Sequence, residues 1–188
     1  MAPPRDEMQV TKRSQDADWE WIVRAHAATV WRIARRLLPD EADAADCFQD
    51  TFASALTAQR RQPINHWPAF LRKLATARAI DLVRRRIRQR RLAASRHDLD
   101  ASASGLPAPS EIAEANELAE RLRAALAEIP RQQAEVFCLA VLESMPHAEV
   151  AEQCGITANH VGVLIHRARA RLRPLLTVDS PSQSVTEA

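Results

Sequence analysis

Glycine and tyrosine are the residues that this sequence has least of. Only 3 of its 188 residues are glycine, against roughly 7% in average proteins, and tyrosine is absent. A chain so poor in glycine has no glycine-rich loop to hold a phosphate and too few turn residues for a β-barrel. Much of its hydrophobic content is alanine, the strongest helix former. The composition predicts an all-α protein of one medium domain or two small ones.

Cysteine and long apolar runs are scarce as well. The three cysteines (Cys47, Cys138 and Cys154) form no C-x-x-C pair, so we interpret them as small buried hydrophobes in a reducing cytosol. No run approaches the 18 apolar residues of a membrane span, and no signal peptide is visible. The histidines lack metal-binding spacing, and no catalytic motif is present. We expect a cytoplasmic protein without membrane insertion that is not an enzyme and holds no cofactor or metal.

The charges are segregated along the chain, although the formal net charge is only +2. Residues 37–59 contain five acids and no base, whereas residues 60–96 contain twelve Lys and Arg residues and Asp81 as the only acid. Residues 97–120 contain six acids and no base. This asymmetry predicts contact with a nucleic acid or a membrane surface at one place and with a basic partner at another.

Hydrophobic periodicity and proline positions predict two small helical domains. The predicted segments are a disordered arm (1–17), a first domain (18–93), a flexible linker rich in Ser, Gly and Pro (94–112), a second domain (113–177) and a disordered tail (178–188). Helices are expected over about 19–38, 41–59, 69–91, 111–128 and 130–142, with a loop at 62–66. A short helix, a turn and a long helix are expected over 146–174.

This last segment has helix-turn-helix spacing. Ala151 lies four residues before Gly155, which lies six before Val161. A small residue lets two helices cross closely, glycine accepts the positive φ at the end of the first helix, and Val161 packs the second helix back. Four arginines follow without an acid among them, as contact with DNA phosphates requires: Arg167, Arg169, Arg171 and Arg173. An ordinary αα-hairpin is the alternative.

A second motif places Asp46, Gln49 and Asp50 on one face of the predicted helix over 41–59, because Gln49 and Asp50 follow Asp46 by three and four residues. Ala45, Phe48, Phe52 and Leu56 gather on another face. A solvated acidic face is the ordinary explanation of such a pattern.

An arginine cluster ends the predicted helix over 69–91: Arg84, Arg85, Arg86, Arg88, Arg90 and Arg91. The predicted core stripe of this helix is Phe70, Leu74, Ala77, Ile80, Val83 and Ile87. Asp81, the only carboxylate three or four residues from any of them, cannot pair a cluster of six, so we expect an anionic partner. Nucleic acid is favoured over membrane because no broad apolar face accompanies the cluster. Trp67 and Phe70 could stack on bases, although burial in the core is the simpler explanation for each ring.

Together these residues resemble a bacterial RNA polymerase sigma factor of the extracytoplasmic-function (ECF) group. The resemblance covers about 19–91 and 118–176, and three blocks carry it: residues 35–52, residues 70–86, and residues 126–137 with the helix-turn-helix. It implies a region 2-like domain and a region 4-like domain joined by the linker.

The resemblance also implies partners and sites. Core RNA polymerase would be bound through the clamp helices of its largest subunit, by Asp46, Gln49 and Asp50. Single-stranded minus-10 promoter DNA would be held by Asn65, His66, Trp67, Arg72, Arg78, Arg84, Arg85 and Arg88. Duplex minus-35 DNA would be read by Thr157, Asn159, His160, Arg167 and Arg171. An inhibitory anti-sigma factor is a further expected partner.

Two other functions are compatible with parts of the pattern. A helix-turn-helix DNA-binding regulator that never binds polymerase would leave the acidic face unexplained. A helical adaptor that binds acidic proteins or lipids would leave the Ala151, Gly155 and Val161 spacing unexplained.

Overall fold

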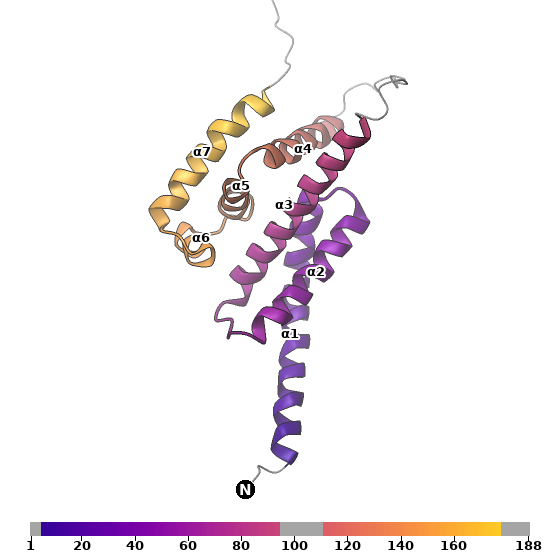
Figure 1. The fold of residues 1–188 in the computed structure, drawn as a ribbon, viewed down its shortest axis with the longest axis vertical. Coiled ribbons are helices and arrows are strands. Elements are labelled where there is room, and N and C mark those ends of the chain that lie inside the picture. Colours follow the sequence, from indigo (N-terminus) through magenta and orange to yellow (C-terminus); the bar gives the residue numbers. More distant parts are fainter. Residues whose placement is uncertain (1–4, 95–110, 178–188) are drawn as a thin grey trace, which may run out of the picture.

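The computed structural model describes residues 5–94, here called the first half, and residues 111–177, the second half. These two ranges form seven α-helices and one π-helical turn, and they contain no strand (Figure 1). The predicted all-α class is confirmed.

Three helices form the first half: α1 (Arg5–Leu37), α2 (Glu41–Gln59) and α3 (Trp67–Ala94). Pro39 follows α1 closely, and the restriction that a proline places on the preceding residue accounts for the end of that helix. Asp40 then caps α2, because its side chain accepts the N–H of Asp43 at 3.0 Å. This hydrogen bond also holds the pKa of Asp40 below its usual value.

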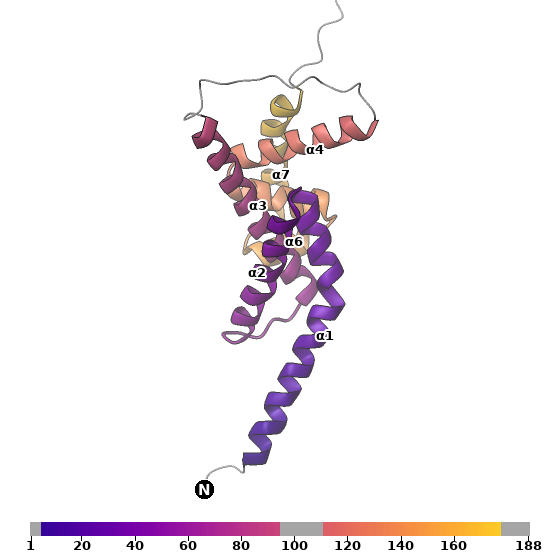
Figure 2. The same cartoon turned by 90° about the vertical axis from the view of Figure 1, so that its right-hand side faces the viewer.

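Helix α1 begins at Arg5, which corrects the predicted disordered arm for residues 5–17. The sequence from Arg5 to Leu37 contains neither proline nor glycine, so no helix breaker interrupts it. The N-terminal part of α1 extends beyond the other helices (Figure 2). The predicted linker is also shorter at both ends, because Ala94 still belongs to α3 and Glu111 begins α4. Residues 1–4, 95–110 and the predicted tail 178–188 lie outside the described residues.

Helix α3 packs against α1 and α2 on one side and against α4, α5 and α6 on the other (Figure 1). Its buried residues are Ala69, Leu71, Ala75, Thr76, Ala79, Ile80 and Val83. The predicted stripe is therefore confirmed at Ile80 and Val83, whereas Phe70, Leu74, Ala77 and Ile87 are only half-buried. A helix covered on two sides has no single apolar face, so periodicity alone placed its core incorrectly.

The second half consists of α4 (Glu111–Glu128), α5 (Arg131–Phe137), α6 (His147–Cys154) and α7 (Ala158–Leu176). A π-helical turn over Cys138–Leu142 continues α5, and the N–H of Glu143 donates to the carbonyl of Cys138 at 2.9 Å. Ser144 follows with a φ of 51°. The short helix, turn and long helix expected over 146–174 are confirmed as α6 and α7.

The corner between α6 and α7 has the conformation that its sequence spacing predicts. Gly155 has a φ of 65°, and the N–H of Ile156 donates to the carbonyl of Ala151 at 3.0 Å. Val161 is fully buried and Ala151 is nearly so. Because only glycine adopts positive φ without strain, Gly155 fixes the angle at which α7 leaves α6.

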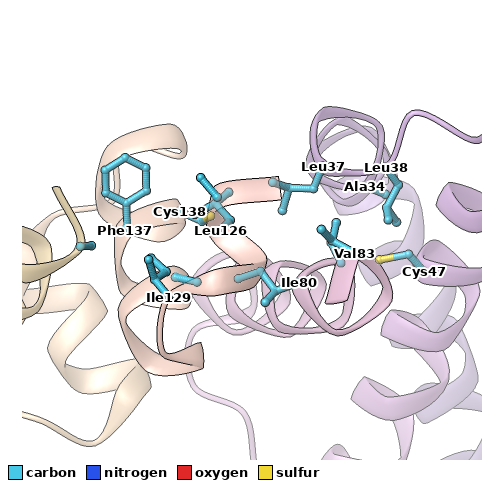
Figure 3. Packing of buried hydrophobic residues seen from close by; sticks show 14 of the residues in the cluster. Ala34, Leu37, Leu38, Cys47, Ile80, Val83, Leu126, Ile129, Phe137 and Cys138 are labelled. Carbon is cyan, nitrogen blue, oxygen red and sulfur yellow. The ribbon is translucent and has the colours of Figure 1, made fainter. Parts of the chain in front are cut away.

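One hydrophobic cluster joins the two halves. Leu37, Ile80 and Val83 of the first half belong to the same buried cluster as Leu126 and Ile129 of the second (Figure 3). Burial of one such side chain contributes about 1.5–3 kcal/mol. The two halves are therefore packed against each other through an apolar core.

Two glycines provide a matched test of the helix-turn-helix corner. A Cβ would meet no atom within 4 Å at either Gly155 or Gly162. Gly155→Ala should lower the free energy of unfolding by about 1–2 kcal/mol, because the left-handed conformation strains an L-residue. Gly162→Ala, inside α7, should raise it by about 0.5–1 kcal/mol. Urea unfolding followed by circular dichroism measures both, and a stabilising Gly155→Ala would contradict the assigned corner.

Candidate nucleic-acid interface

Helix α7 presents its N-terminal turns to solvent. The side chain of Thr157 accepts the N–H of His160 at 3.2 Å and so caps the helix, as its position in the sequence predicts. Asn159 and His160 are exposed, whereas Leu164 is buried in the core of the second half. Helix α7 contacts α4, α5 and α6 and lies at the edge of the molecule away from α1 and α2 (Figure 1). Its first turns are therefore accessible to a large partner.

The arginines of α7 form an exposed basic row. Arg167, Arg169, Arg171 and Arg173 are all exposed, and none of them forms an ion pair with another residue of the described ranges. Exposed arginines directly after accessible polar side chains suit a nucleic-acid duplex. The arginines can bind the phosphate backbone while the polar side chains contact base edges in the adjacent groove.

The loop before α3 presents Asn65 and His66 to solvent. Trp67, by contrast, packs edge-on against Trp19 and Phe70, with ring centroids 6.0 Å and 6.3 Å apart. These contacts of the half-buried Trp67 ring hold the end of the loop in place. The imidazole Nδ1 of His66 lies 3.4 Å from a carboxylate oxygen of Glu149 in α6, so the second half reaches this loop.

The predicted minus-10 arginines of α3 point in several directions. Arg85 and Arg88 are exposed, and Arg72 is half-buried. Arg78 donates to the hydroxyl of Ser54 in α2 at 2.9 Å. The half-buried Arg84 donates instead to the carbonyl of Ile129 in the second half.

Carboxylates beyond the three- and four-residue neighbours that the sequence offered pair with two members of the arginine cluster. Arg86 donates to the two carboxylate oxygens of Asp43 in α2, from Nε at 2.6 Å and from a terminal nitrogen at 2.7 Å. Arg91 forms an ion pair with Glu128 of α4. The sequence indicates only which carboxylates lie nearby on the same helix, whereas Asp43 and Glu128 lie on α2 and α4.

The acidic face of α2 is exposed as a set: Asp46, Gln49 and Asp50 all reach solvent. Phe48 and Phe52 lie beside it with ring centroids 5.0 Å apart and anchor this side of α2 to α1. Trp31 of α1 stacks edge-on against Phe48 at 6.1 Å and is 37% exposed. The contact of Trp31 with Phe48 could not be expected from the sequence, because hydrophobic periodicity assigns the position of Trp31 to solvent.

The cysteines have no reactive environment. Burial raises the pKa of Cys47 to about 11 and that of Cys138 to about 12, so both thiols stay protonated. The described residues contain no group of three or more His, Cys, Asp and Glu side chains placed to hold a metal ion. None of the helices over these ranges combines the length and apolar character that a membrane span needs.

Polar side chains also join the two halves, and little in the sequence indicated these contacts. The carboxylate of Glu143 is 2% exposed and binds Arg32 and Arg36 of α1. The ammonium group of Lys73 donates to the carbonyl of Gln153. The only signal was an acid directly after the apolar run from Phe137 to Leu142, and its partners lie more than 100 residues away in the sequence.

Comparison with known proteins gives the family. Residues 22–89 match the model of Sigma-70 region 2, and residues 119–172 match that of Sigma-70, region 4. The chain is 31% identical to the ECF RNA polymerase sigma factor SigE of Mycolicibacterium smegmatis, over 86% of this chain and 63% of that protein. It is 30% identical to the RNA polymerase sigma factor CnrH of Cupriavidus metallidurans, over 85% of this chain and 86% of that protein.

Solved structures share the fold. The sigma factor RpoE of Bartonella quintana, in complex with the anti-sigma factor NepR, superposes with a TM-score of 0.50 at 21% identity, covering 86% of this chain and 98% of that one. CnrH in complex with the cytosolic domain of CnrY gives a TM-score of 0.56 at 23% identity, covering 88% of this chain and 91% of that one.

The two family models and the sequence relatives together define the family. The chain belongs to the ECF group of RNA polymerase sigma factors, a family of transcription initiation factors.

Proposed function

We propose that this sigma factor binds core RNA polymerase through the acidic face of α2 and directs it to promoters by holding minus-10 DNA with its first half and minus-35 DNA with α7. The observation that carries this proposal is the exposed, unpaired arginine row of α7 behind an accessible N-terminal turn. It occurs on a chain that also presents an exposed acidic face on a different helix.

The acidic face suits a basic helical partner, such as the clamp helices of the largest polymerase subunit. Asp46 and Asp50 supply two carboxylates one turn apart, and Gln49 supplies an amide between them. The aromatic contacts of Phe48 hold this part of α2 in place, so the face is already formed before a partner arrives.

The loop before α3 suits single-stranded minus-10 DNA. Asn65 is exposed and could contact a base that leaves the stack, and His66 could do so once it leaves Glu149. Trp67 packs against Trp19 and holds the start of α3 beside this loop. Arg85 and Arg88 are exposed members of the cluster and could bind phosphates.

An inhibitory partner of the anti-sigma class belongs to the same proposal. Two of the solved structures that share this fold are sigma factors in complex with NepR and with the cytosolic domain of CnrY. A protein that binds polymerase through an exposed acidic surface and promoter DNA through exposed basic surfaces can be silenced by a partner that covers them.

The polymerase-binding prediction concerns Asp46 and Gln49. Asp46→Ala with Gln49→Ala should abolish binding to core polymerase while leaving the fold intact, since exposed substitutions change stability by less than about 0.5 kcal/mol. Glu20→Ala with Gln89→Ala, also exposed on the first half, removes the same two chemical groups elsewhere and should bind normally. Pull-down with core polymerase measures both, and equal binding by the two variants would contradict the assigned face.

The minus-10 prediction concerns salt dependence. Arg85→Gln and Arg88→Gln should each weaken binding to single-stranded DNA of any sequence and reduce the log–log salt slope by about one unit. Arg24→Gln, an exposed arginine on α1, is the matched control and should leave the slope unchanged. Fluorescence anisotropy over a salt series gives the slopes. If Arg24→Gln lowered the salt slope as much as the other two substitutions, the assignment of single-stranded DNA to α3 would be contradicted.

The minus-35 prediction separates base reading from phosphate binding on α7. Asn159→Ala should cost about 1–3 kcal/mol on the preferred sequence and relax selection at one position, because asparagine binds adenine in the major groove with two hydrogen bonds. Arg171→Ala should lower affinity for all sequences alike. Binding-site selection with each variant measures this difference. Recovery of the same motif with equal stringency by Asn159→Ala and wild type would refute the assignment.

A further inference from the structure

The two halves are joined by a buried carboxylate as well as by apolar contacts. The side chain of Glu143 accepts hydrogen bonds from both terminal nitrogens of Arg32, at 3.3 Å and 2.8 Å. It also accepts one from Arg36 at 3.0 Å, and the same arginine donates to the carbonyl of Leu142. Glu143 belongs to the second half and both arginines to α1 in the first, so this cluster exists only while the halves are in contact.

Burial makes the cluster depend on all three side chains. Only 2% of the Glu143 side chain is exposed, whereas Arg32 and Arg36 are 47% and 40% exposed. A carboxylate withdrawn from water is unfavourable unless cations pair with it. The arginines lose much less hydration on closure, so Glu143 is the member whose burial decides whether the contact forms.

Further polar contacts join α3 and the loop before it to the second half. From one end of this surface to the other they are His66 with Glu149 (3.4 Å), Lys73 with the carbonyl of Gln153, Asp81 with Arg131 (2.9 Å), Arg84 with the carbonyl of Ile129, and Arg91 with Glu128. His66 and Arg84 are two of the side chains assigned to minus-10 DNA. They cannot hold the second half and a DNA strand at once.

The contact also limits the reach of the chain. The minus-10 and minus-35 elements are about 25 base pairs apart, which is about 85 Å along a duplex at 34–36 Å per turn. In the structure α6 contacts α3, and α3 is the helix assigned to minus-10 DNA. The halves must therefore separate before both elements are bound, whereas the acidic face and the first turns of α7 are already exposed.

We propose that Glu143, Arg32 and Arg36 form a latch that holds the free protein closed and withholds its minus-10 surface from single-stranded DNA. Closure leaves the acidic face of α2 and the duplex-reading turns of α7 accessible. Release of the latch frees His66 and Arg84 from their partners in the second half and exposes the apolar residues of the shared core. The effect on DNA rests on the function proposed above, but the latch itself does not.

A native thiol reports on opening. Cys138 is 1% exposed and shares a small cavity with Ile33, Leu37 and Thr76 of the first half, so separation of the halves uncovers it. Cys47 is buried within the first half, with its Sγ 3.7 Å from the carbonyl of Ala75, and reacts only when that half unfolds. The assay is iodoacetamide labelling in a Cys154→Ser background, with peptide mass spectrometry reporting the two thiols separately.

Glu143→Arg should make Cys138 react about tenfold faster or more, because the reaction rate follows the open population, while Cys47 stays slow. Glu152→Arg changes the net charge equally at an exposed site and should leave Cys138 slow. Adding Arg32→Glu and Arg36→Glu to Glu143→Arg restores opposite charges and should restore protection. An unchanged Cys138 rate in Glu143→Arg would overturn the latch. Equal acceleration of both thiols in Glu143→Arg and in the milder Glu143→Gln would also overturn it, since Glu143 would then stabilise the whole fold.

A second measurement tests the DNA consequence separately. Glu143→Arg should bind a fluorescent single-stranded oligonucleotide several-fold more tightly than Glu152→Arg, which carries the same added charge, whereas the two should bind duplex DNA equally. A faster Cys138 with no gain in strand binding would support the latch and overturn the assignment of minus-10 DNA to the covered surface. Tighter strand binding by both variants alike would show a pure charge effect and overturn the proposed occlusion.

Discussion

Helix α3 is buried against α1 and α2 on one side and against the second half of the chain on the other. Ile80 and Val83 therefore belong to a core that includes Leu126 and Ile129. This double burial decides which arginines of α3 remain exposed and which are held by neighbouring helices. It also explains why so many alanines lie along the helix, since small side chains let four or more helices approach one axis closely.

The charges of this protein divide into groups used within the fold and groups left for partners. Arg86 pairs with Asp43, and Arg32 and Arg36 surround Glu143, so these charges are neutralised inside the molecule. The arginines of α7 and the acids of the α2 face have no such role among the described residues. A net charge of +2 thus conceals an acidic surface and a basic surface on different helices.

The contact between the halves combines a stable apolar part with a polar part that water can replace. Leu37, Leu126 and Cys138 exclude water, whereas the contacts of His66, Lys73 and Asp81 lie at or near solvent. Interfaces of this mixed kind are typical of domains that move relative to each other. Such a contact suits the proposed change from a compact free protein to an extended promoter-bound one.

Local features of the sequence determined the helices, the caps and the helix-turn-helix, because each depends on residues a few positions apart. Asp40, Gly155 and Thr157 adopt the conformations that their residue types favour wherever they occur. The two-sided burial of α3, the pairing of Arg86 with Asp43 and the burial of Glu143 between two arginines depended on contacts between distant segments. Tertiary structure alone decided them. A periodic pattern shows which positions of a helix are apolar, but it carries no information about which other helix packs against them.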